Sequence, residues 1–501
     1  MDRLANHADT LCRRVKVVDG HTLRPTVGSR YTVQLHTLDA SRLARIQTDL
    51  TLTPKYKSEG KDDSFKVWDQ GDSQVEVPRY YGINTFGVPQ GASDTRKAGS
   101  PWHDGVTFHG RLRDTPPQSL IVDSAVRVLT SPLGGCILQL GCGQGKTVCA
   151  LAIAGRLARR TAILVNNGKT LLPQWMERIA QFYPTAKVGI VRSSRNDLKD
   201  PDVDIVVCVI QSLAKRTYDQ DLLDTVGMVI VDECHHVGAR VFAQCMRQFR
   251  ARHTLGLTAT PDRKDGLRKY VEYLLGPVAV TCPTDFTRVK ILRYIYKGAR
   301  INAHATAKDH LQRCLMVNDA TRDFERTLFL LKVVLNIVKE SPRRVLVLTE
   351  RVQQVDDFAK WFTQSGCTDS VARLHAGVPR DQVMEAASSR VVVANYPMAS
   401  EALDIPHLDT ILCLTPIVGF IEQVVGRIVR ISDHKCVPLV IDVVDNVGLF
   451  AGMARTRQRW YRTAKVAEVR DCAVEHSGEY EIVKPSSVVR EWLTEEDPWN
   501  K

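Results

Sequence analysis

The chain has 501 residues, of which 44% are hydrophobic and 25% are charged, and its formal net charge at pH 7 is +12. This length is too great for one hydrophobic core and indicates about two to four domains, while the composition excludes a disordered or fibrous protein. No apolar run reaches the roughly 18 residues that span a bilayer, and the first residues carry no secretory signal, so we expect an intracellular protein, cytoplasmic or nuclear, with no membrane partner.

The cysteines and the net charge restrict further which kinds of protein this sequence can be. The 13 cysteines include no Cys-x-x-Cys pair, and several lie in apolar runs, as Cys136, Cys208 and Cys413 do. This pattern is typical of reduced cysteines in a core, so we expect neither a zinc site nor a disulfide framework. The basic charge favours a polyanionic partner, although many basic proteins never bind nucleic acid.

Residues 1–110 are expected to form an accessory region. Short alternating segments such as 31–35, separated by polar turns, indicate a small α/β or β-rich appendage, and the charged stretch 55–73 predicts an exposed loop. The segment Arg79-Tyr80-Tyr81 follows. It could contact a nucleic-acid strand by charge and stacking, or its rings could anchor this part of the chain on the next domain.

Gln118 lies ahead of a predicted helix at the start of the next domain, for which we expect the bounds 111–285. Its side-chain amide both donates and accepts, so it could read the edge of an adenine and is a candidate ATP-binding residue. By itself, a glutamine in such a place is more often a surface residue.

A phosphate-binding loop is predicted next, between the apolar strand 136–140 and a helix. Its residues are Leu140, Gly141, Cys142, Gly143, Gln144, Gly145, Lys146 and Thr147. In such a loop, main-chain N–H groups and the positive end of the helix cradle phosphate. We expect Lys146 to reach the β- and γ-phosphates and Thr147 to ligate Mg²⁺, so ATP and Mg²⁺ are the expected cofactors. Leu140 stands where the strict motif has its first glycine.

An acidic pair follows a later strand. Apolar runs such as 161–165, 205–210 and 228–231 alternate with helical stretches, which predicts a parallel sheet covered on both faces. Asp232 and Glu233 come directly after the last of these strands, where ligands of such sheets bind. We expect Asp232 to hold Mg²⁺ and Glu233 to orient or deprotonate the attacking water, the alternative being two solvated acids.

A second candidate element carries hydroxyl groups at the end of the strand 254–257. The tripeptide Thr258, Ala259 and Thr260 could bond through its hydroxyls to the acidic pair or to His235 and so pass the nucleotide state onward. Taken alone, the tripeptide would be an ordinary loop.

The second half of the chain is predicted to be another α/β domain, with the bounds 286–465, followed by a peripheral tail at 466–501. A long helix is expected over 308–339, and the strand-like runs are 345–348, 371–374, 391–394 and 410–414. Spacings of three and four place Gln423, Arg427 and Arg430 on one face of a helix. Such arginines could reach a γ-phosphate bound by the first domain, the alternative being a solvated helix face.

Together these motifs, in this order over about residues 110–465, resemble those of superfamily two DEAD/DEAH-like helicases and translocases. The details of 142–147 and 258–266 are similar to the branch that holds the nucleotide-excision-repair translocase. The segment 77–82, with Phe86-Gly87 after it, resembles the helicases of large cytoplasmic DNA viruses, including the poxvirus transcript-release helicase.

The resemblance implies two tandem recombinase-like parallel-sheet domains with a small N-terminal appendage, and ATP·Mg²⁺ bound between the domains. It implies that Asp404 joins the ATP-binding set and that His235, Thr258, Ala259 and Thr260 couple the nucleotide to the strand. The residues that it places near the nucleic acid are Asn167, Gln174, Gln211, Arg351 and Met398. If the protein is viral, we expect it in the host cytoplasm or the virion.

The expected function is that of an ATP-dependent DNA or RNA helicase or translocase, in viral transcription termination or DNA repair. Its expected partners are nucleic acid and the transcription or repair machinery. Three alternatives stay open: a duplex translocase that separates no strands, a P-loop kinase or biosynthetic ligase that ignores nucleic acid, and a nucleic-acid-binding scaffold with a vestigial ATP site. Strand polarity, the preference for DNA or RNA, and the oligomeric state also stay open.

Overall fold

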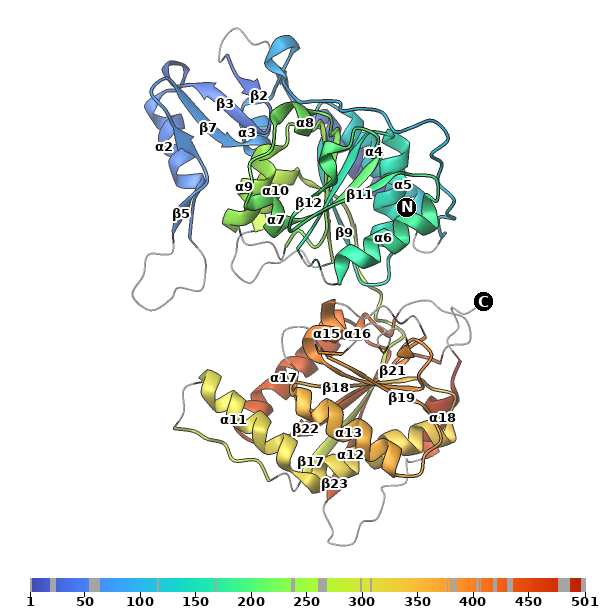
Figure 1. Cartoon of the computed structure of the whole chain (residues 1–501). Helices are drawn as coiled ribbons and strands as arrows, with labels where there is room; N and C mark the ends of the chain where they lie inside the picture. Colours follow the sequence, from blue (N-terminus) through green and yellow to red (C-terminus); the bar gives the residue numbers. More distant parts are fainter. Residues whose placement is uncertain are drawn as a thin grey trace. The chain divides into compact units, whose positions relative to one another are not determined.

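The computed structural model describes residues 2–18, 24–53, 64–114, 117–166, 168, 170–235, 239–259, 268–297, 300–306, 309–375, 377–378, 382, 385–401, 405, 407–417, 421–429, 436–475 and 487–496. The chain forms two compact units, Met1–Pro283 and Thr284–Lys501, and each is built around one large sheet with helices packed against it (Figure 1).

The large sheet of the first unit is parallel except at one edge. In spatial order, its eight strands among the described residues are β12 (Arg195–Asn196), β11 (Val188–Arg192), β13 (Ile205–Val209), β10 (Thr161–Val165), β14 (Met228–Val231), β15 (His253–Thr258), β9 (Gly135–Leu140) and β16 (Val278–Cys282). Only the short β12 pairs antiparallel, with β11. Every residue of β10, β13 and β14 is buried, because helices cover both faces of the sheet.

The helices around this sheet connect successive strands or flank it. They are α4 (Gln118–Thr130), α5 (Lys146–Leu157), α6 (Leu171–Phe182), α7 (Ile210–Ala214), α8 (Gln220–Asp224), α9 (Ala239–Gln248) and α10 (Arg268–Leu275). Loops that follow the parallel strands therefore gather at one edge of the sheet, where such sheets bind ligands.

The first 110 residues form a small appendage that packs onto this unit. Its elements are α1 (Asp2–Arg14), β1 (Val17–Val18), β2 (Thr26–Val27), β3 (Arg30–Gln34), α2 (Ala40–Asp49), β4 (Thr51–Leu52), β5 (Phe65–Lys66), β6 (Asp69–Gln70), β7 (Gln74–Pro78), α3 (Arg79–Phe86) and β8 (Val88–Pro89). Strands β2, β3, β7 and β6 make an antiparallel sheet. Helix α1 packs against α4, where Arg127 and Asp9 form an ion pair.

Helix α3 decides between the two roles predicted for its first three residues, contact with a nucleic-acid strand and anchoring on the next domain. Arg79, Tyr80 and Tyr81 are all buried, so the reading in which they contact a nucleic-acid strand is wrong. Arg79 donates to the carbonyl oxygens of Phe249 and Ala251, and the Tyr80 hydroxyl lies 2.5 Å from that of Thr254 on β15. These residues therefore anchor the appendage on the first unit.

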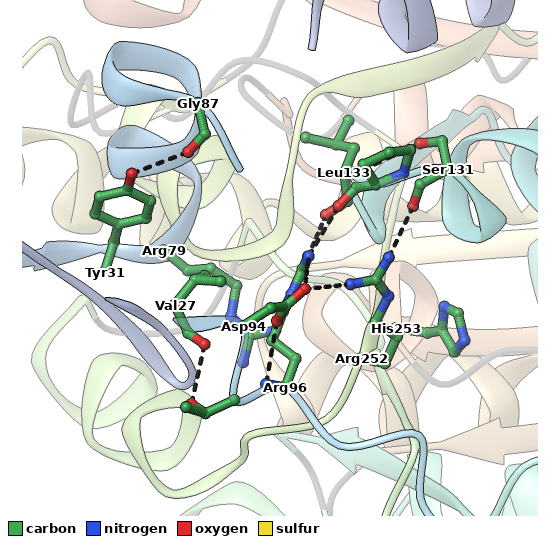
Figure 2. Close-up of polar contacts among 12 residues, drawn as sticks. Val27, Tyr31, Arg79, Gly87, Asp94, Arg96, Ser131, Leu133, Arg252 and His253 are labelled. Atoms are coloured by element: carbon green, nitrogen blue, oxygen red, sulfur yellow. Dashed lines mark hydrogen bonds and ion pairs between the residues drawn. The ribbon is translucent and has the colours of Figure 1, made fainter. Parts of the chain in front are cut away.

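A cluster of Asp94, Arg96 and Arg252 beside α3 also attaches the appendage to the rest of the first unit (Figure 2). The Asp94 carboxylate accepts from both Arg96 and Arg252, the latter on the chain that leads into β15. Arg96 also donates to the carbonyl of Leu133, just before β9. Asp94 and Arg96 thus attach the end of the appendage to the residues just before β9 and β15, which are neighbouring strands of the sheet.

The charged stretch 55–73 is not wholly the exposed loop that the sequence predicts. Residues 54–63 lie outside the described residues, but β5 and β6 follow them, and Val67 and Trp68 between these strands are buried. The apolar pair packs into the appendage core, which charge composition alone does not reveal.

The large sheet of the second unit is parallel throughout the described residues. In spatial order, its strands are β19 (Val371–Leu374), β20 (Val391–Asn395), β18 (Val345–Thr349), β21 (Thr410–Cys413), β22 (Leu439–Asp445), β17 (Lys290–Lys297) and β23 (Glu468–Glu475). The helices of this unit include α11 (Asp309–Arg322), α12 (Phe324–Glu340), α13 (Val352–Gln364), α15 (Tyr396–Glu401), α16 (Ile421–Val425), α17 (Gly448–Thr463) and α18 (Ser487–Thr494).

Two features of this unit correct the sequence analysis. The single helix expected over 308–339 is two helices, because Asp323 ends α11 and caps α12 by accepting from the N–H of Arg326. The stretch 466–501, expected to be a peripheral tail, instead supplies β23, which pairs with β17 along its length. It also supplies α18, whose Trp492 is buried.

The predicted fold class is confirmed: the chain has two tandem α/β units with parallel sheets and a small N-terminal appendage. Within the described ranges, every helix falls short of the length and apolar character that crossing a membrane requires.

Candidate nucleotide site and nucleic-acid surface

The phosphate loop joins β9 to α5 and has the conformation that its sequence predicts. Gly143 and Gly145 have φ angles of +76° and +84°, which residues with a Cβ rarely adopt. A Cβ at position 145 would also lie 2.2 Å from Nε2 of Gln118, so this position requires glycine. Lys146 begins α5, and its Nζ lies 3.4 Å from the carbonyl oxygen of Leu140.

Gln118 is buried against this loop and is not a surface residue. Its Nε2 donates to the carbonyl oxygen of Gln144 at 3.1 Å, and its Oε1 accepts from the N–H of Arg113 at 2.9 Å. Arg113 in turn donates from Nη2 to the carbonyl oxygen of Gly143 at 2.8 Å. The two side chains therefore hold two consecutive residues of the loop. The sequence around Arg113 does not predict this role.

The acidic pair lies at the carboxyl end of β14. Asp232 is buried, with Oδ1 accepting from the N–H of Glu233 at 2.9 Å and Oδ2 accepting from the indole N–H of Trp175 at 2.8 Å. Burial raises the pKa of Asp232, and the charge of Glu233 raises it further, while the Trp175 hydrogen bond and Lys146 act against this rise.

Glu233 connects the phosphate loop to the coupling residues. Its Oε1 lies 3.6 Å from Nζ of Lys146, and its Oε2 lies 3.5 Å from Nδ1 of His235. The same His235 nitrogen lies 2.8 Å from the hydroxyl oxygen of Thr258 on β15. Glu233 also has a φ of +44°, an uncommon backbone conformation of the kind that clusters at functional sites. The structure thus brings Lys146, Glu233, His235 and Thr258 into one chain of contacts.

The residues of this site fit Mg²⁺·ATP. The loop offers main-chain N–H groups at the start of α5, and Lys146 adds a positive charge. The Thr147 hydroxyl, in the first turn of α5, and the Asp232 carboxylate supply oxygen atoms, which Mg²⁺ prefers as ligands together with phosphate oxygens. Ala259 is buried after β15, whereas Thr260 and Asp404 lie outside the described residues.

The nucleic-acid candidates of the first unit follow strands of the same sheet. Gln174 is half-buried on α6, and Gln211 is exposed at the start of α7, directly after β13, where it donates to the carbonyl oxygen of Asn166 at 2.9 Å. Asn167 lies outside the described residues. Arg192 is exposed at the end of β11, and Ser193 after it donates its N–H to the hydroxyl of Ser212 on α7 at 3.1 Å, which holds the β11–β12 hairpin beside α7.

The candidates of the second unit are Arg351 and Met398, at the start of α13 and on α15. Arg351 directly precedes α13 and donates to Oδ1 of Asn318 and to the carbonyl oxygen of Cys314, so α11 holds its guanidinium. Met398 is half-buried on α15.

The predicted arginine helix is shorter than its sequence pattern. Helix α16, which carries Gln423, ends at Val425, and Arg427 lies in the turn after it, with its N–H bonded to the carbonyl of Val424. The single helix expected to carry Gln423, Arg427 and Arg430 therefore ends before Arg427. Gln423 and Arg427 are both half-buried, and Arg430 lies outside the described residues.

The chain is similar to known proteins in sequence. Residues 112–263 match the family described as "Type III restriction enzyme, res subunit". The chain is 28% identical to "Putative ATP-dependent RNA helicase L396" of Acanthamoeba polyphaga mimivirus, over 87% of this chain and 84% of that protein. It is 25% identical to "Putative ATP-dependent RNA helicase QP509L" of African swine fever virus, over 77% of this chain and 78% of that protein.

A solved structure shares the fold. It is the fragment structure of a putative HsdR subunit of a type I restriction enzyme from Vibrio vulnificus YJ016, which matches 74% of this chain and 70% of its own with a TM-score of 0.53 at 16% identity. The predicted resemblance to superfamily two helicases, and among them to those of large DNA viruses, is confirmed.

Proposed function

We propose that this chain is an ATP-dependent motor that moves along nucleic acid, as a helicase or translocase. The observation that carries the proposal is the chain of contacts from Lys146 through Glu233 and His235 to Thr258, beside a phosphate loop held by Gln118. A site of this kind suits phosphoryl transfer to water, where positioning and electrostatic stabilisation do most of the work.

The residues of the first unit divide the chemistry between them. Mg²⁺·ATP, when bound, supplies the phosphoanhydride bond whose hydrolysis drives movement. Lys146 and the loop N–H groups bind the phosphates, while Thr147 and Asp232 hold the metal ion. Glu233 orients the attacking water and takes its proton, and Nζ of Lys146, 3.6 Å from its Oε1, helps to hold this carboxylate in place.

The second unit supplies the cationic groups of the reaction in this proposal. Gln423, Arg427 and Arg430 sense the γ-phosphate and stabilise the charge that develops on it, with Asp404 contributing to nucleotide binding. His235 and Thr258 pass the state of the nucleotide to the end of β15. Two conformational states of the protein that bind the strand with different affinity then allow the protein to move along it in steps.

The proposed track is a DNA or RNA strand that contacts Gln174, Gln211, Asn167, Arg351 and Met398. The net charge of +12 supports such a partner. The names of the mimivirus and African swine fever virus relatives point to RNA, so RNA belongs among the strands to be tested. Similarity to helicases of large DNA viruses supports a function together with transcription or repair machinery inside a host cell.

ATP turnover of the purified chain tests the proposal. It should be measured alone, with single-stranded DNA, with duplex DNA and with RNA, at low and high salt. We expect at least one nucleic acid to stimulate turnover at low salt, and the stimulation to weaken at high salt as phosphate contacts are screened. Turnover indifferent to every strand would favour a P-loop kinase or ligase instead.

A further inference from the structure

The indole N–H of Trp175 makes a buried hydrogen bond to the metal-binding carboxylate of the site. Trp175 is on α6 and Asp232 follows β14, and the donor and acceptor are 2.8 Å apart. Only 2% of Trp175 and 7% of Asp232 are exposed. Water does not compete well for a hydrogen bond in such surroundings, so this bond is stronger than one at the surface.

This bond determines how the carboxylate of Asp232 is oriented. The N–H of Glu233 binds Oδ1 and the Trp175 indole binds Oδ2, so each oxygen is held by one donor and keeps acceptor capacity for a metal ion. Partners behind a metal ligand fix its orientation, and their loss typically costs 10- to 100-fold in metal affinity or activity. The N–H of Glu233 belongs to the residue next to Asp232, whereas the indole of Trp175 belongs to a different element, α6.

Helix α6 joins this contact to the surface of the unit. Leu172, Trp175 and Ile179 form its buried face, while Gln174, the neighbour of Trp175, is half-buried and belongs to the proposed nucleic-acid surface. The helix is three turns long and packs against α5 and β13. A rigid helix transmits displacement, so a ligand that moves Gln174 also moves the indole beside it.

We propose that Trp175 is a positioning residue that orients Asp232 for Mg²⁺ and makes this orientation depend on nucleic acid bound at α6. The proposal rests on the proposed function and deepens it, because it names a direct mechanical route from the strand to the metal-binding carboxylate. It assigns no chemistry to Trp175 itself.

Trp175→Phe tests this, because phenylalanine keeps an aromatic ring in the core and removes the N–H donor. Binding of a fluorescent ATP analogue should be titrated with Mg²⁺, and turnover should be measured with and without the best nucleic acid. We expect the half-saturating Mg²⁺ concentration to rise about 10-fold and the ratio of stimulated to basal turnover to fall towards one. Binding of the analogue in EDTA should be unchanged, since Lys146 and the loop are intact.

Trp102→Phe is the matched control. Trp102 is buried in the same unit and packs edge-on against Tyr183, but among the described residues its indole nitrogen has no hydrogen-bond partner. This change should leave the Mg²⁺ titration and the stimulation ratio at their wild-type values. If Trp175→Phe does not fold, 3-benzothienylalanine at position 175 keeps the fused ring and deletes only the N–H.

The outcomes separate this proposal from the proposed function. A variant that lacks the donor yet keeps the wild-type Mg²⁺ titration or the wild-type stimulation ratio would overturn the role of Trp175 while the motor function stands. A wild-type chain that no strand stimulates would instead overturn the motor function and the coupling together. The Mg²⁺ titration of nucleotide binding does not depend on turnover.

Discussion

The side-chain amide of Gln118 donates to the carbonyl oxygen of Gln144 across 3.1 Å, and so joins the start of α4 to the phosphate loop. Together with Arg113, it holds the loop through the main-chain carbonyl oxygens of Gly143 and Gln144. Nucleotide binding should therefore depend on this glutamine through the shape of the loop.

Gln118→Glu should weaken binding of ATP and GTP by the same factor, about 10-fold or more. The change places a carboxylate oxygen against the carbonyl oxygen of Gln144, which turns a hydrogen bond into a buried repulsion. Equilibrium binding of fluorescent ATP and GTP analogues measures this. Gln90→Glu, the same change at an exposed position, should have no effect. A loss confined to ATP would show that Gln118 acts by reading adenine.

Glu233→Gln should lower kcat at least 100-fold and leave ATP bound. The amide cannot take a proton from water, and general bases typically contribute 100-fold or more. Rapid-quench measurement of turnover with parallel nucleotide binding separates the two effects. Glu177→Gln, on the exposed part of α6, should turn over normally. Full hydrolysis by the Glu233 variant would assign the water to another residue.

The phosphate loop and acidic pair could be predicted because each follows a strand that its apolar residues mark. Parallel strands bring their carboxyl ends to one edge, so Lys146 and Glu233 could be expected near each other before any contact was known. The Thr258 contact with His235 is predictable for the same reason.

The contacts of Trp175 and Arg79 could not be predicted, because their partners lie 57 and 172 residues away in the chain. A tryptophan on an apolar helix face and an arginine beside two tyrosines have many possible partners. The pattern of neighbouring residues shows that such side chains are buried or charged, but tertiary packing selects what they bond to.

Strand β23 was missed for a different reason. It is an edge strand whose residues 468–473 alternate between half-buried and exposed and include charged ones, as natural edges do. Its composition therefore resembles that of a solvated tail. Only the pairing with β17, most of whose residues are buried, shows that it belongs to the sheet.

Tyr80→Phe should destabilise the first unit by about 1 kcal/mol and leave strand affinity unchanged. The change deletes the buried hydrogen bond to Thr254 but keeps the ring in the core. Thermal melting measures the loss, and a double-mutant cycle with Thr254→Val isolates the pair. Weaker nucleic-acid binding at unchanged stability would contradict the anchoring role of α3.

The melting temperature of the first unit should fall as the pH drops below about 6.5, partly because of His253. Burial lowers the pKa of His253 to about 4, and the nearby Arg252 and Arg96 add to this. The unfolded chain takes up the proton near pH 6.5. This contribution is therefore complete above pH 6.5 and is lost progressively towards pH 4, by up to about 3 kcal/mol.

His253→Gln is the comparison for that titration. Glutamine can still donate to the carbonyl oxygen of Leu129, which lies 3.0 Å from Nδ1 of His253, but it does not titrate. Between pH 7 and pH 5, the melting temperature of the wild type should fall more than that of the variant. A constant difference over this range would show that His253 is protonated to the same extent in both states.

Arg427→Lys should lower strand-stimulated turnover by about 1,000-fold while nucleotide binding by the first unit persists. Lysine keeps the charge but loses the planar fork that holds two phosphate oxygens, and arginine fingers contribute on this scale. Rapid-quench turnover and analogue binding measure the two properties separately. Arg462→Lys, on the exposed face of α17 in the same unit, is the control and should retain full turnover. Normal turnover by Arg427→Lys would mean that Arg427 does not act on the γ-phosphate.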